Sequence, residues 1–417
     1  MERLIFHVDV NSAFLSWEAV RLVKNGESDV RLIPSCIGGD PNSRRGIVLA
    51  KSIPAKKYGI VTGEPIGLAL QKCPELMVLP ADFKLYAASS RAFKSILREY
   101  APVVEEFSID EAFLDMSGTA LLYPDPLALA HTMKNRIRDE LGFTVNVGIG
   151  RNKLCAKMAS DFEKPDKVHT LFPEEIESKL WPLPVGDLLF VGRSSVRRLE
   201  TAGIRTIGEL GHADPKLLAS LLGEKMSRQA YRYANGIDDS PVRAEPEIPK
   251  GFSNEVTLEE DVVRDEQAHA VLLSLADCVS ARLRDEGYKA QGISVTVRYL
   301  NFQKRSHQCM LERATHSSRT VYETSKKLLS ELWGDHRPLR LMGIAATNLL
   351  GKDEPEEGQL SLFGEEDSAA GRKNEKLDQA LDSLRRRFGS GAVKRGASMT
   401  VREEVARKYK GKSDSER

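Results

Sequence analysis

The segment "EFSIDEAFLDMS" (106–117) places two adjacent carboxylates, Asp110 and Glu111, inside a stretch that otherwise has the apolar residues of a buried strand. A carboxylate that leaves water without a partner costs several kcal/mol, so a regular buried strand would not tolerate the pair. Adjacent side chains of a strand also point to opposite faces, whereas the bend at a hairpin end can bring both to one rim. The segment therefore predicts two short strands that meet near Asp110.

The segments on either side of this hairpin predict the βαββαβ order of a ferredoxin-like domain. Apolar and polar residues alternate over residues 4–9, which predicts a strand with Asp9 at its far end. Residues 83–101 have apolar side chains at mostly helical spacing, and a second helix is expected at about 126–141. The strand "FTVNVGI" (143–149) completes the order.

Asp9, at the end of the first expected strand, is placed to reach the same rim as Asp110 and Glu111. Three carboxylates at strand ends form a site suited to hard divalent cations, which prefer oxygen ligands. The alternative is an acidic, solvated turn to which Asp9 is unrelated. These residues alone leave both interpretations open.

Over residues 171–245 the predicted secondary structure changes to short helical segments, which are separated by turns at Gly192 and Gly203. Paired helices with glycine turns are typical of helix-hairpin-helix modules, whose backbone N–H groups hold a DNA phosphate. An ordinary helical hairpin fits the pattern equally well. The prolines of "AEPEIPKG" (244–251) indicate a linker, and residues 252–350 beyond it predict a separate α/β domain.

The chain is nearly neutral overall, with 61 basic and 60 acidic side chains, yet local segments are strongly charged. From Lys289 to Arg340 there are ten Lys and Arg residues against four Asp and Glu residues, a net charge of +6. This excess favours a polyanionic partner, with a solvated surface as the alternative. No apolar run approaches the roughly 18 residues of a membrane span, and the five cysteines form no C-x-x-C pair. We therefore expect no membrane contact and a location in the cytoplasm.

An acidic segment, residues 353–367, contains the apolar peptide "QLSLF" (359–363). A disordered acidic loop would normally lack large apolar residues. The peptide therefore either docks into the groove of a partner or folds back on its own chain. The basic residues of the following segment, 372–412, leave nucleic-acid contact and simple solvation both open.

Five segments, in this order, resemble the Y-family translesion DNA polymerases, most closely the bacterial DNA polymerase IV group: "FHVDVNSAFLSWEA", "FSIDEAFLD", "VGIGRNKLCAKMASDFEKP", "VGRSSVRRLETAGIRTIGEL" and "QLSLF". The resemblance implies an α+β multidomain protein with the architecture of a right hand. Its expected parts are a ferredoxin-like palm (1–10 and 76–170), small fingers (11–75), a helix-hairpin-helix thumb (171–243), an α/β little finger (244–350) and a tail (351–417).

The same resemblance assigns roles to individual residues. Asp9, Asp110 and Glu111 match the catalytic carboxylates of the family, and together with the backbone carbonyl of Val10 they match its ligands for two Mg²⁺ ions. Phe14 matches the steric gate, an aromatic ring that fills the space of a ribonucleotide 2′-hydroxyl group; the alternative is an ordinary core phenylalanine. The residues that match nucleotide-binding positions are Phe14, Lys56 and Lys164.

The expected fingers depart from the family pattern in "LAKSIPAKKYG" (49–59). Ala50, Ile53 and Lys56 stand where the family usually has Thr, Tyr and Arg, which touch the triphosphate. Two hydrogen-bond donors are missing, and Lys56 keeps the positive charge but not the bidentate fork of arginine. Ala13 also replaces an aromatic residue that commonly precedes the gate. We therefore expect weakened or rearranged nucleotide binding.

The resemblance implies a template-directed DNA polymerase that adds deoxyribonucleotides to a primer 3′-hydroxyl on damaged templates, without proofreading. The implied partners are primer–template DNA, deoxyribonucleoside triphosphates and the bacterial sliding clamp, and a monomer is expected. The clamp would be engaged by Gln359, Leu360, Leu362 and Phe363. One alternative is a DNA- and clamp-binding accessory factor with weakened catalysis. Another is a nucleotide cyclase, which also uses a ferredoxin-like palm but needs no clamp-binding peptide.

Overall fold

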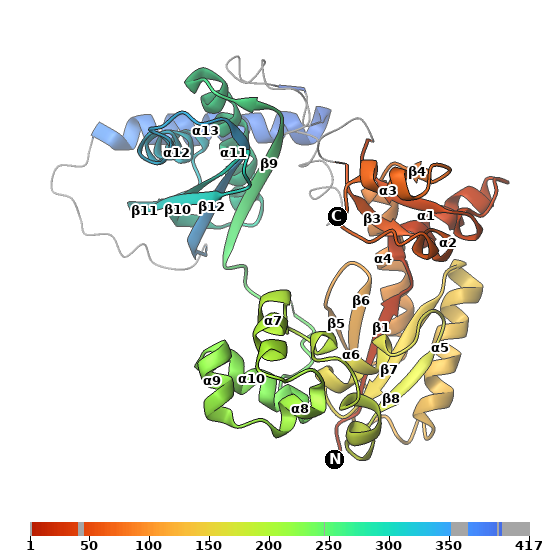
Figure 1. The fold of residues 1–417 in the computed structure, drawn as a ribbon. Coiled ribbons are helices and arrows are strands. Elements are labelled where there is room, and N and C mark those ends of the chain that lie inside the picture. Colours follow the sequence, from red (N-terminus) through yellow and green to blue (C-terminus); the bar gives the residue numbers. More distant parts are fainter. Residues whose placement is uncertain (1, 41–45, 246, 352–365, 390–391, 394–417) are drawn as a thin grey trace. The chain divides into compact units, whose positions relative to one another are not determined.

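The computed structural model describes residues 2–40, 46–245, 247–351, 366–389 and 392–393. These residues form two compact units (Figure 1): the first unit extends to the end of the segment at 245, and the second unit begins at Glu247. The boundary falls within the proline-bearing segment that the sequence indicates as a linker. Each unit has a hydrophobic core of its own.

A five-stranded sheet forms the centre of the first unit. Its strand order is β5-β6-β1-β7-β8, so β1 lies in the middle and pairs antiparallel with both β6 and β7. The strands are β1 (Ile5–Val10), β5 (Val103–Glu106), β6 (Glu111–Asp115), β7 (Val145–Gly150) and β8 (Val168–Leu171). The predicted hairpin is confirmed, because β5 and β6 pair antiparallel and Asp110 immediately precedes β6.

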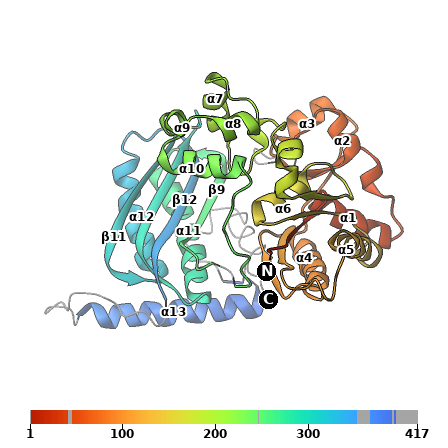
Figure 2. The same cartoon turned by 90° about the horizontal axis from the view of Figure 1, so that it is seen from below.

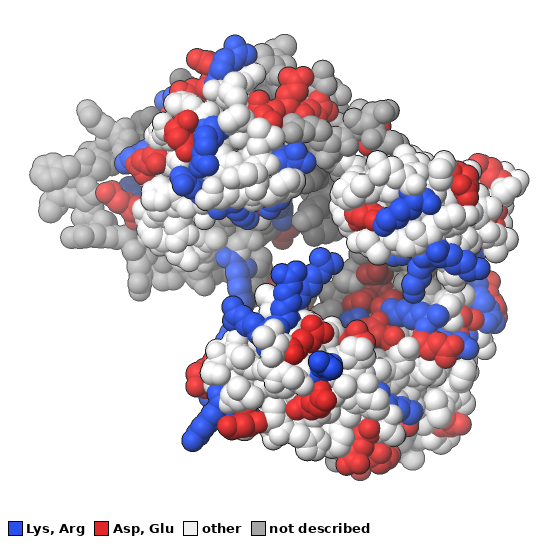
Figure 3. All heavy atoms as spheres, viewed as in Figure 1, with Lys and Arg blue, Asp and Glu red and all other residues white. Residues whose placement is uncertain are grey.

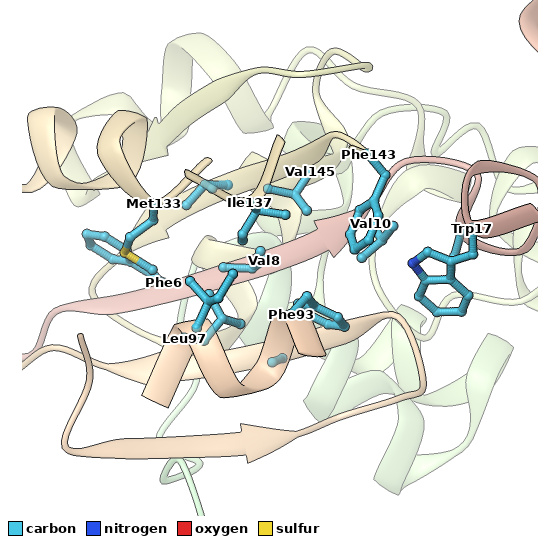
Figure 4. Packing of buried hydrophobic residues seen from close by; sticks show 14 of the residues in the cluster. Phe6, Val8, Val10, Trp17, Phe93, Leu97, Met133, Ile137, Phe143 and Val145 are labelled. Carbon is cyan, nitrogen blue, oxygen red and sulfur yellow. The ribbon is translucent and has the colours of Figure 1, made fainter. Parts of the chain in front are cut away.

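Three helices cover the two faces of this sheet. On one face, α4 (Phe83–Arg98) and α5 (Pro126–Leu141) pack against every second residue of β1, where Phe6 and Val8 contribute to the main core (Figure 4). On the other face lies α6 (Lys153–Asp161). The βαββαβ order predicted from the sequence is therefore confirmed.

The close approach of α6 to the sheet depends on a glycine. A Cβ atom built on Gly148 of β7 would lie 2.0 Å from the carbonyl oxygen of Ala156 and 2.4 Å from the backbone nitrogen of Ser160. Such distances are far below van der Waals contact, so only glycine lets the helix backbone pack this tightly against the strand. The side chains of α6 are thereby brought directly over the middle of the sheet.

The remainder of the first unit consists of two smaller groups of elements. Between β1 and α4 lies a three-stranded sheet of order β3-β2-β4 with short helices. These elements are α1 (Ala13–Lys24), a 3-10 helix (Val30–Leu32), β2 (Ser35–Gly38), β3 (Val48–Lys51), α2 (Ile53–Lys57), α3 (Ile66–Lys72) and β4 (Met77–Leu79). After β8, short 3-10 and π segments (Pro173–Glu175, Ile176–Leu180, Val185–Asp187) lead to α7 (Arg193–Thr201), α8 (Ile207–His212), α9 (Pro215–Leu222) and α10 (Glu224–Ala234).

The second unit is built on a four-stranded antiparallel sheet of order β11-β10-β12-β9. Its strands are β9 (Gly251–Val262), β10 (Lys289–Tyr299), β11 (Lys304–Thr315) and β12 (Leu339–Leu350). The helices α11 (Asp265–Asp285) and α12 (Ser318–Leu332) cover one face of this sheet (Figure 2). Ile293, Val295 and Val297 of β10 point into the resulting core, whereas the residues between them lie on the open face. The separate α/β domain expected from the sequence is confirmed.

A further helix of the second unit, α13 (Glu366–Phe388), is attached to α11 by charged side chains. The Arg284 guanidinium, on α11, is 7% exposed and its Nε donates to Asp382 Oδ2 at 2.6 Å. Asp378 Oδ2 accepts a bond from the backbone nitrogen of Ser318 at 2.9 Å, and Arg386 pairs with Asp285 at 2.7 Å. Part of the basic segment 372–412 thus pairs with acidic residues of the same chain.

We predict that Arg284→Met destabilises the second unit by about 3–5 kcal/mol, because it leaves Asp378 and Asp382 buried without their cation. Hydrogen exchange of α11 and α13 in the full-length protein, measured across a urea series, reports this change. The matched control is Arg387→Met on the exposed side of α13, expected to change stability by at most about 0.5 kcal/mol. Equal protection of α13 in both variants would show that the buried charges do not hold this helix.

Candidate active site at the ends of β1 and β6

The end of β1 brings Asp9 and Glu111 together. The two residues are direct partners in the antiparallel register of β1 and β6. Register partners have their side chains on the same face of a sheet, and here that face is the one covered by α6. The Asp9 side chain is 10% exposed and the Glu111 side chain 17% exposed, so both carboxylates are largely withdrawn from water.

Asp110 occupies the turn immediately before β6. Its backbone carbonyl accepts a bond from the backbone nitrogen of Val10 at 3.0 Å, which fixes the turn beside the end of β1. Its carboxylate Oδ1 accepts a bond from the hydroxyl group of Ser108 at 2.6 Å. Within the described residues, no three His, Cys, Asp or Glu side chains converge closely enough to hold a metal ion. The structure therefore places the Asp110 turn beside the end of β1, where Ser108 holds the Asp110 carboxylate, while Asp9 and Glu111 both lie within ion-pair distance of Lys157.

Two lysines supply positive charge to the paired carboxylates. Lys164 Nζ lies 2.9 Å from Asp9 Oδ2, and Lys157 Nζ of α6 lies 2.8 Å from Glu111 Oε1. Asp161, at the end of α6, contacts both ammonium groups, at 2.8 Å from Lys164 and 3.4 Å from Lys157. The resulting cluster alternates negative and positive charges, which offsets the cost of burying them.

Lys157 and Asp161 were missed by the sequence analysis, which singled out only Lys164. The spacing of Lys157 and Asp161, four residues apart, predicts a shared helical face, and Lys164 follows three residues after the end of α6. The pattern does not reveal which strand this face covers. Only the packing of α6 on β1 shows that the lysines meet the carboxylates.

The two carboxylates have opposite pKa shifts. Burial raises the pKa of Asp9 to about 7, and the charge of Lys164 opposes this shift without cancelling it. Burial would also raise the pKa of Glu111, but His7 and Lys157 outweigh it and hold that pKa well below its usual range. The pKa of Lys157 is raised, because its acidic neighbours outweigh the effect of burial. Glu111 is therefore ionised at neutral pH, whereas burial keeps the pKa of Asp9 raised despite its contact with Lys164.

Phe14 lies in the first turn of α1, just after Ser12, whose φ of 46° turns the chain out of β1. Its ring stacks on Tyr86 with centroids 4.6 Å apart and an angle of 11° between the planes. Phe83 meets it edge-on at 6.0 Å. Phe14 is partly buried, so its ring is fixed by aromatic neighbours while one part remains accessible.

The residues that depart from the family pattern lie on β3 and α2. Ala50 is buried, the Ile53 side chain is 54% exposed, and Lys56 is exposed. Burial lowers the pKa of Lys51, and the positive charge of Lys56 lowers it further. Lys51 carries no sequence motif that would have singled it out beside Lys56. The expected clamp-binding residues Gln359, Leu360, Leu362 and Phe363 lie outside the described residues.

Comparisons with known proteins agree along the chain. Residues 8–161 match the impB/mucB/samB family, residues 249–362 match the C-terminal domain of that family, and residues 186–238 match the thumb domain of DNA polymerase iota. A DNA polymerase IV of Clostridium acetobutylicum is 43% identical over 405 residues, which cover 97% of this chain and 100% of the relative. The chain belongs to the Y-family DNA polymerases.

Other Y-family relatives extend this result. DNA polymerase IV 1 of Bacillus subtilis is 34% identical and covers 99% of this chain, with 96% of its own length matched. A solved Y-family DNA polymerase chimera has the same fold, with a TM-score of 0.74 at 22% identity over 84% of this chain and 99% of the chimera. Family membership excludes the nucleotide cyclase alternative. Among the described helices, none is long and apolar enough to cross a membrane.

Proposed function

We propose that this Y-family member is a template-directed DNA polymerase of the translesion type, which adds deoxyribonucleotides to a primer 3′-hydroxyl without proofreading. The observation that carries the proposal is the pairing of Asp9 with Glu111 beside the Asp110 turn, in a chain that matches DNA polymerase IV relatives over nearly its whole length. By sequence resemblance, these residues match the carboxylates that the family uses for nucleotidyl transfer. We further expect the protein to act as a monomer in the cytoplasm.

The chemistry of the donor atoms fits two Mg²⁺ ions. Asp9, Asp110, Glu111 and the backbone carbonyl of Val10 offer only oxygen ligands, which hard divalent cations prefer. The raised pKa of Asp9 also reflects a buried carboxylate that positive charge would stabilise. When bound, the ions would supply activation of the primer hydroxyl and neutralise charge on the leaving pyrophosphate.

The lysines are proposed to orient the nucleotide. Asp161 Oδ1 lies 2.8 Å from Lys164 Nζ. This contact would keep the Lys164 ammonium group at the site when a triphosphate replaces Asp9 as its partner. A triphosphate is a stronger anion than a single carboxylate, which favours this exchange. Lys56 supplies a second positive group on α2, and Lys51 of β3 adds positive charge near it. Phe14 is proposed to exclude ribonucleotides by overlap of its fixed ring with the 2′-hydroxyl group.

DNA is proposed to bind through positive and small polar surfaces of each unit. Figure 3 shows Lys and Arg side chains gathered over α7, where Arg193, Arg197 and Arg198 are exposed. Such residues beside a helix-hairpin-helix turn suit DNA phosphates. On the open face of the second unit, the small Thr296 and Ser294 would allow a nucleic-acid backbone to approach. These surfaces support the proposed division into palm, fingers, thumb and little finger.

One alternative keeps the fold but weakens the chemistry. The exposed Ile53 offers no hydrogen bond to a triphosphate, and Lys56 cannot form the paired bonds of an arginine. An accessory factor that binds DNA and the clamp would tolerate both changes. The paired carboxylates and their lysines argue against it, because a chain without catalysis has no need to bury this cluster.

We predict that Asp110→Asn slows primer extension about a hundred- to a thousandfold, while the affinity for primer–template DNA stays nearly unchanged. The amide can still accept the Ser108 hydrogen bond, so the turn should persist. Extension of lesion-bearing and undamaged templates with Mg²⁺, together with a DNA-binding assay, measures both properties. The control is Asp115→Asn at the far end of β6. Undiminished extension by Asp110→Asn would contradict the proposed catalytic role.

A second prediction concerns the gate. Phe14→Ala should raise ribonucleotide incorporation relative to deoxyribonucleotide incorporation by about ten- to two-hundredfold, since it removes the overlapping ring. Single-nucleotide kinetics give the ratio of kcat/KM values. Tyr86→Phe is the control, because it keeps the stacking ring and removes only a buried hydroxyl group that has no hydrogen-bond partner among the described residues. An unchanged ratio in Phe14→Ala would assign Phe14 to the core alone.

A third prediction tests the proposed clamp-binding peptide, residues 359–363. The triple change Gln359→Ala, Leu362→Ala and Phe363→Ala should abolish clamp-stimulated synthesis and leave extension without clamp unchanged. The reason is that a few apolar anchors carry most of the energy of such a peptide, and the clamp acts by raising the local enzyme concentration. Leu377→Ala, an exposed apolar residue of α13, is the control. Clamp binding retained by the triple variant, measured by calorimetry, would refute the assignment.

A further inference from the structure

A buried lysine of α4 contacts the turn that carries Asp110. Lys94 lies on α4, whose Phe93 and Leu97 belong to the main core (Figure 4). The Lys94 side chain is only 5% exposed. An aliphatic residue of similar length would fill such a place without the cost of removing an ammonium group from water. The contacts of Lys94 should therefore explain why a charge is placed here.

The ammonium group of Lys94 bonds to the end of β5 and to the turn that follows it. Its Nζ lies 2.9 Å from Glu106 Oε2 and donates to the backbone carbonyl oxygen of Ser108 at 2.7 Å. The Glu106 side chain is 52% exposed, so water screens this ion pair. The Ser108 carbonyl oxygen, in contrast, is part of the backbone, so this second bond holds the course of the chain itself.

A second residue of α4 reaches the same turn. Ser90 lies one helical turn before Lys94, so the two side chains share a face of the helix. The Ser90 hydroxyl group donates to the backbone carbonyl oxygen of Ile109. The consecutive carbonyl groups of Ser108 and Ile109 are therefore both held by α4. A connection between two strands is usually among the more mobile parts of a fold, and these bonds restrict it.

The turn passes this restraint on to the Asp110 carboxylate. Ser108, whose carbonyl oxygen accepts the bond from Lys94, donates its own hydroxyl proton to Asp110 Oδ1 at 2.6 Å. The carbonyl oxygen of Asp110 accepts a bond from the backbone nitrogen of Val10 at 3.0 Å, which joins the turn to the end of β1. A continuous path of hydrogen bonds thus runs from Lys94 through Ser108 to Asp110.

We propose that Lys94 and Ser90 are positioning residues for Asp110: they fix the backbone of its turn from α4, and the Ser108 hydroxyl group then fixes the carboxylate proposed for nucleotidyl transfer. This inference rests on the proposed polymerase function and deepens it. Because both residues are buried and contact the turn backbone, they act through Asp110 and not on the nucleotide. Their loss should lower the rate of nucleotide addition while nucleotide affinity remains unchanged.

The kinetic test removes the ammonium group and keeps most of the length of the side chain. Lys94→Met should lower the single-turnover rate of nucleotide addition about 10–100-fold, with unchanged nucleotide affinity. The matched control is Arg98→Met, which removes the other ion pair of Glu106 on the same helix and leaves Lys94 in place. This control should change neither property. Equal rate losses in both variants, with equal losses of melting temperature, would assign Lys94 to stability alone and overturn the inference.

A double variant tests whether Lys94 acts through Asp110. Two changes that act through one group are not additive, whereas independent effects multiply. In the Asp110→Asn background, Lys94→Met should therefore slow primer extension by at most about twofold further. A further loss as large as that in the unaltered background would overturn the inference.

Hydrogen exchange tests the turn without catalysis. The backbone nitrogens of Phe107 and Ser108 donate to the carbonyl oxygen at the start of β6, both at 3.2 Å, and the Val10 nitrogen donates to that of Asp110. In the full-length protein without added metal, DNA or nucleotide, Lys94→Met should speed exchange of these three amides about tenfold or more. The amides of β7 and β8 should keep their protection.

Ser90→Ala is a milder change that leaves the lysine in place, and it decides the question where Lys94→Met does not fold. It should speed exchange of the same amides about three- to tenfold, because it removes one hydrogen bond to the turn. Arg98→Met should leave their exchange unchanged. Unchanged exchange of the turn in Ser90→Ala and in Lys94→Met would overturn the inference. Inactivity of the unaltered protein would instead count against the proposed function, and hydrogen exchange would still decide whether α4 holds the turn.

Discussion

The pairing of β1 with β6 is the constraint on which the site depends. Their register sets Asp9 opposite Glu111 on the face that receives α6. Two buried carboxylates side by side would repel each other, and neither could remain ionised without nearby positive charge. The helix that brings Lys157 can pack so closely only because Gly148 has no side chain. The strand register, the glycine and the lysines therefore depend on one another.

Local sequence patterns predicted the individual strands, helices and turns of the first unit. The hairpin at Asp110 was predictable because a buried strand does not tolerate adjacent carboxylates, and helix α4 because its apolar residues recur at mostly helical spacing. The βαββαβ order follows from such elements taken together. The roles of Phe14 and Lys164 came from family resemblance, since neither residue is distinctive by itself.

Several of the contacts that were not predictable from the sequence join distant segments. His7 meets Ser160 across 153 positions, and Arg385 pairs with Asp277 across 108. Periodicity shows which residues share a face but not which element that face contacts. The basic segment 372–412 illustrates the limit: its charge predicted contact with nucleic acid or with water, yet two of its arginines, Arg385 and Arg386, pair with acidic residues of α11.

The attachment of α13 has a consequence for how the second unit responds to heat. Apolar contacts gain little further strength on warming, whereas the cost of removing charged groups from water falls as temperature rises. The interface around Arg284 is built from buried ion pairs, while Leu377 and Phe388 of α13 remain exposed. Relative to the apolar core beneath α11, this interface gains strength with temperature. The helix should therefore leave the sheet domain only when that domain itself melts, unlike most terminal helices, which fray first.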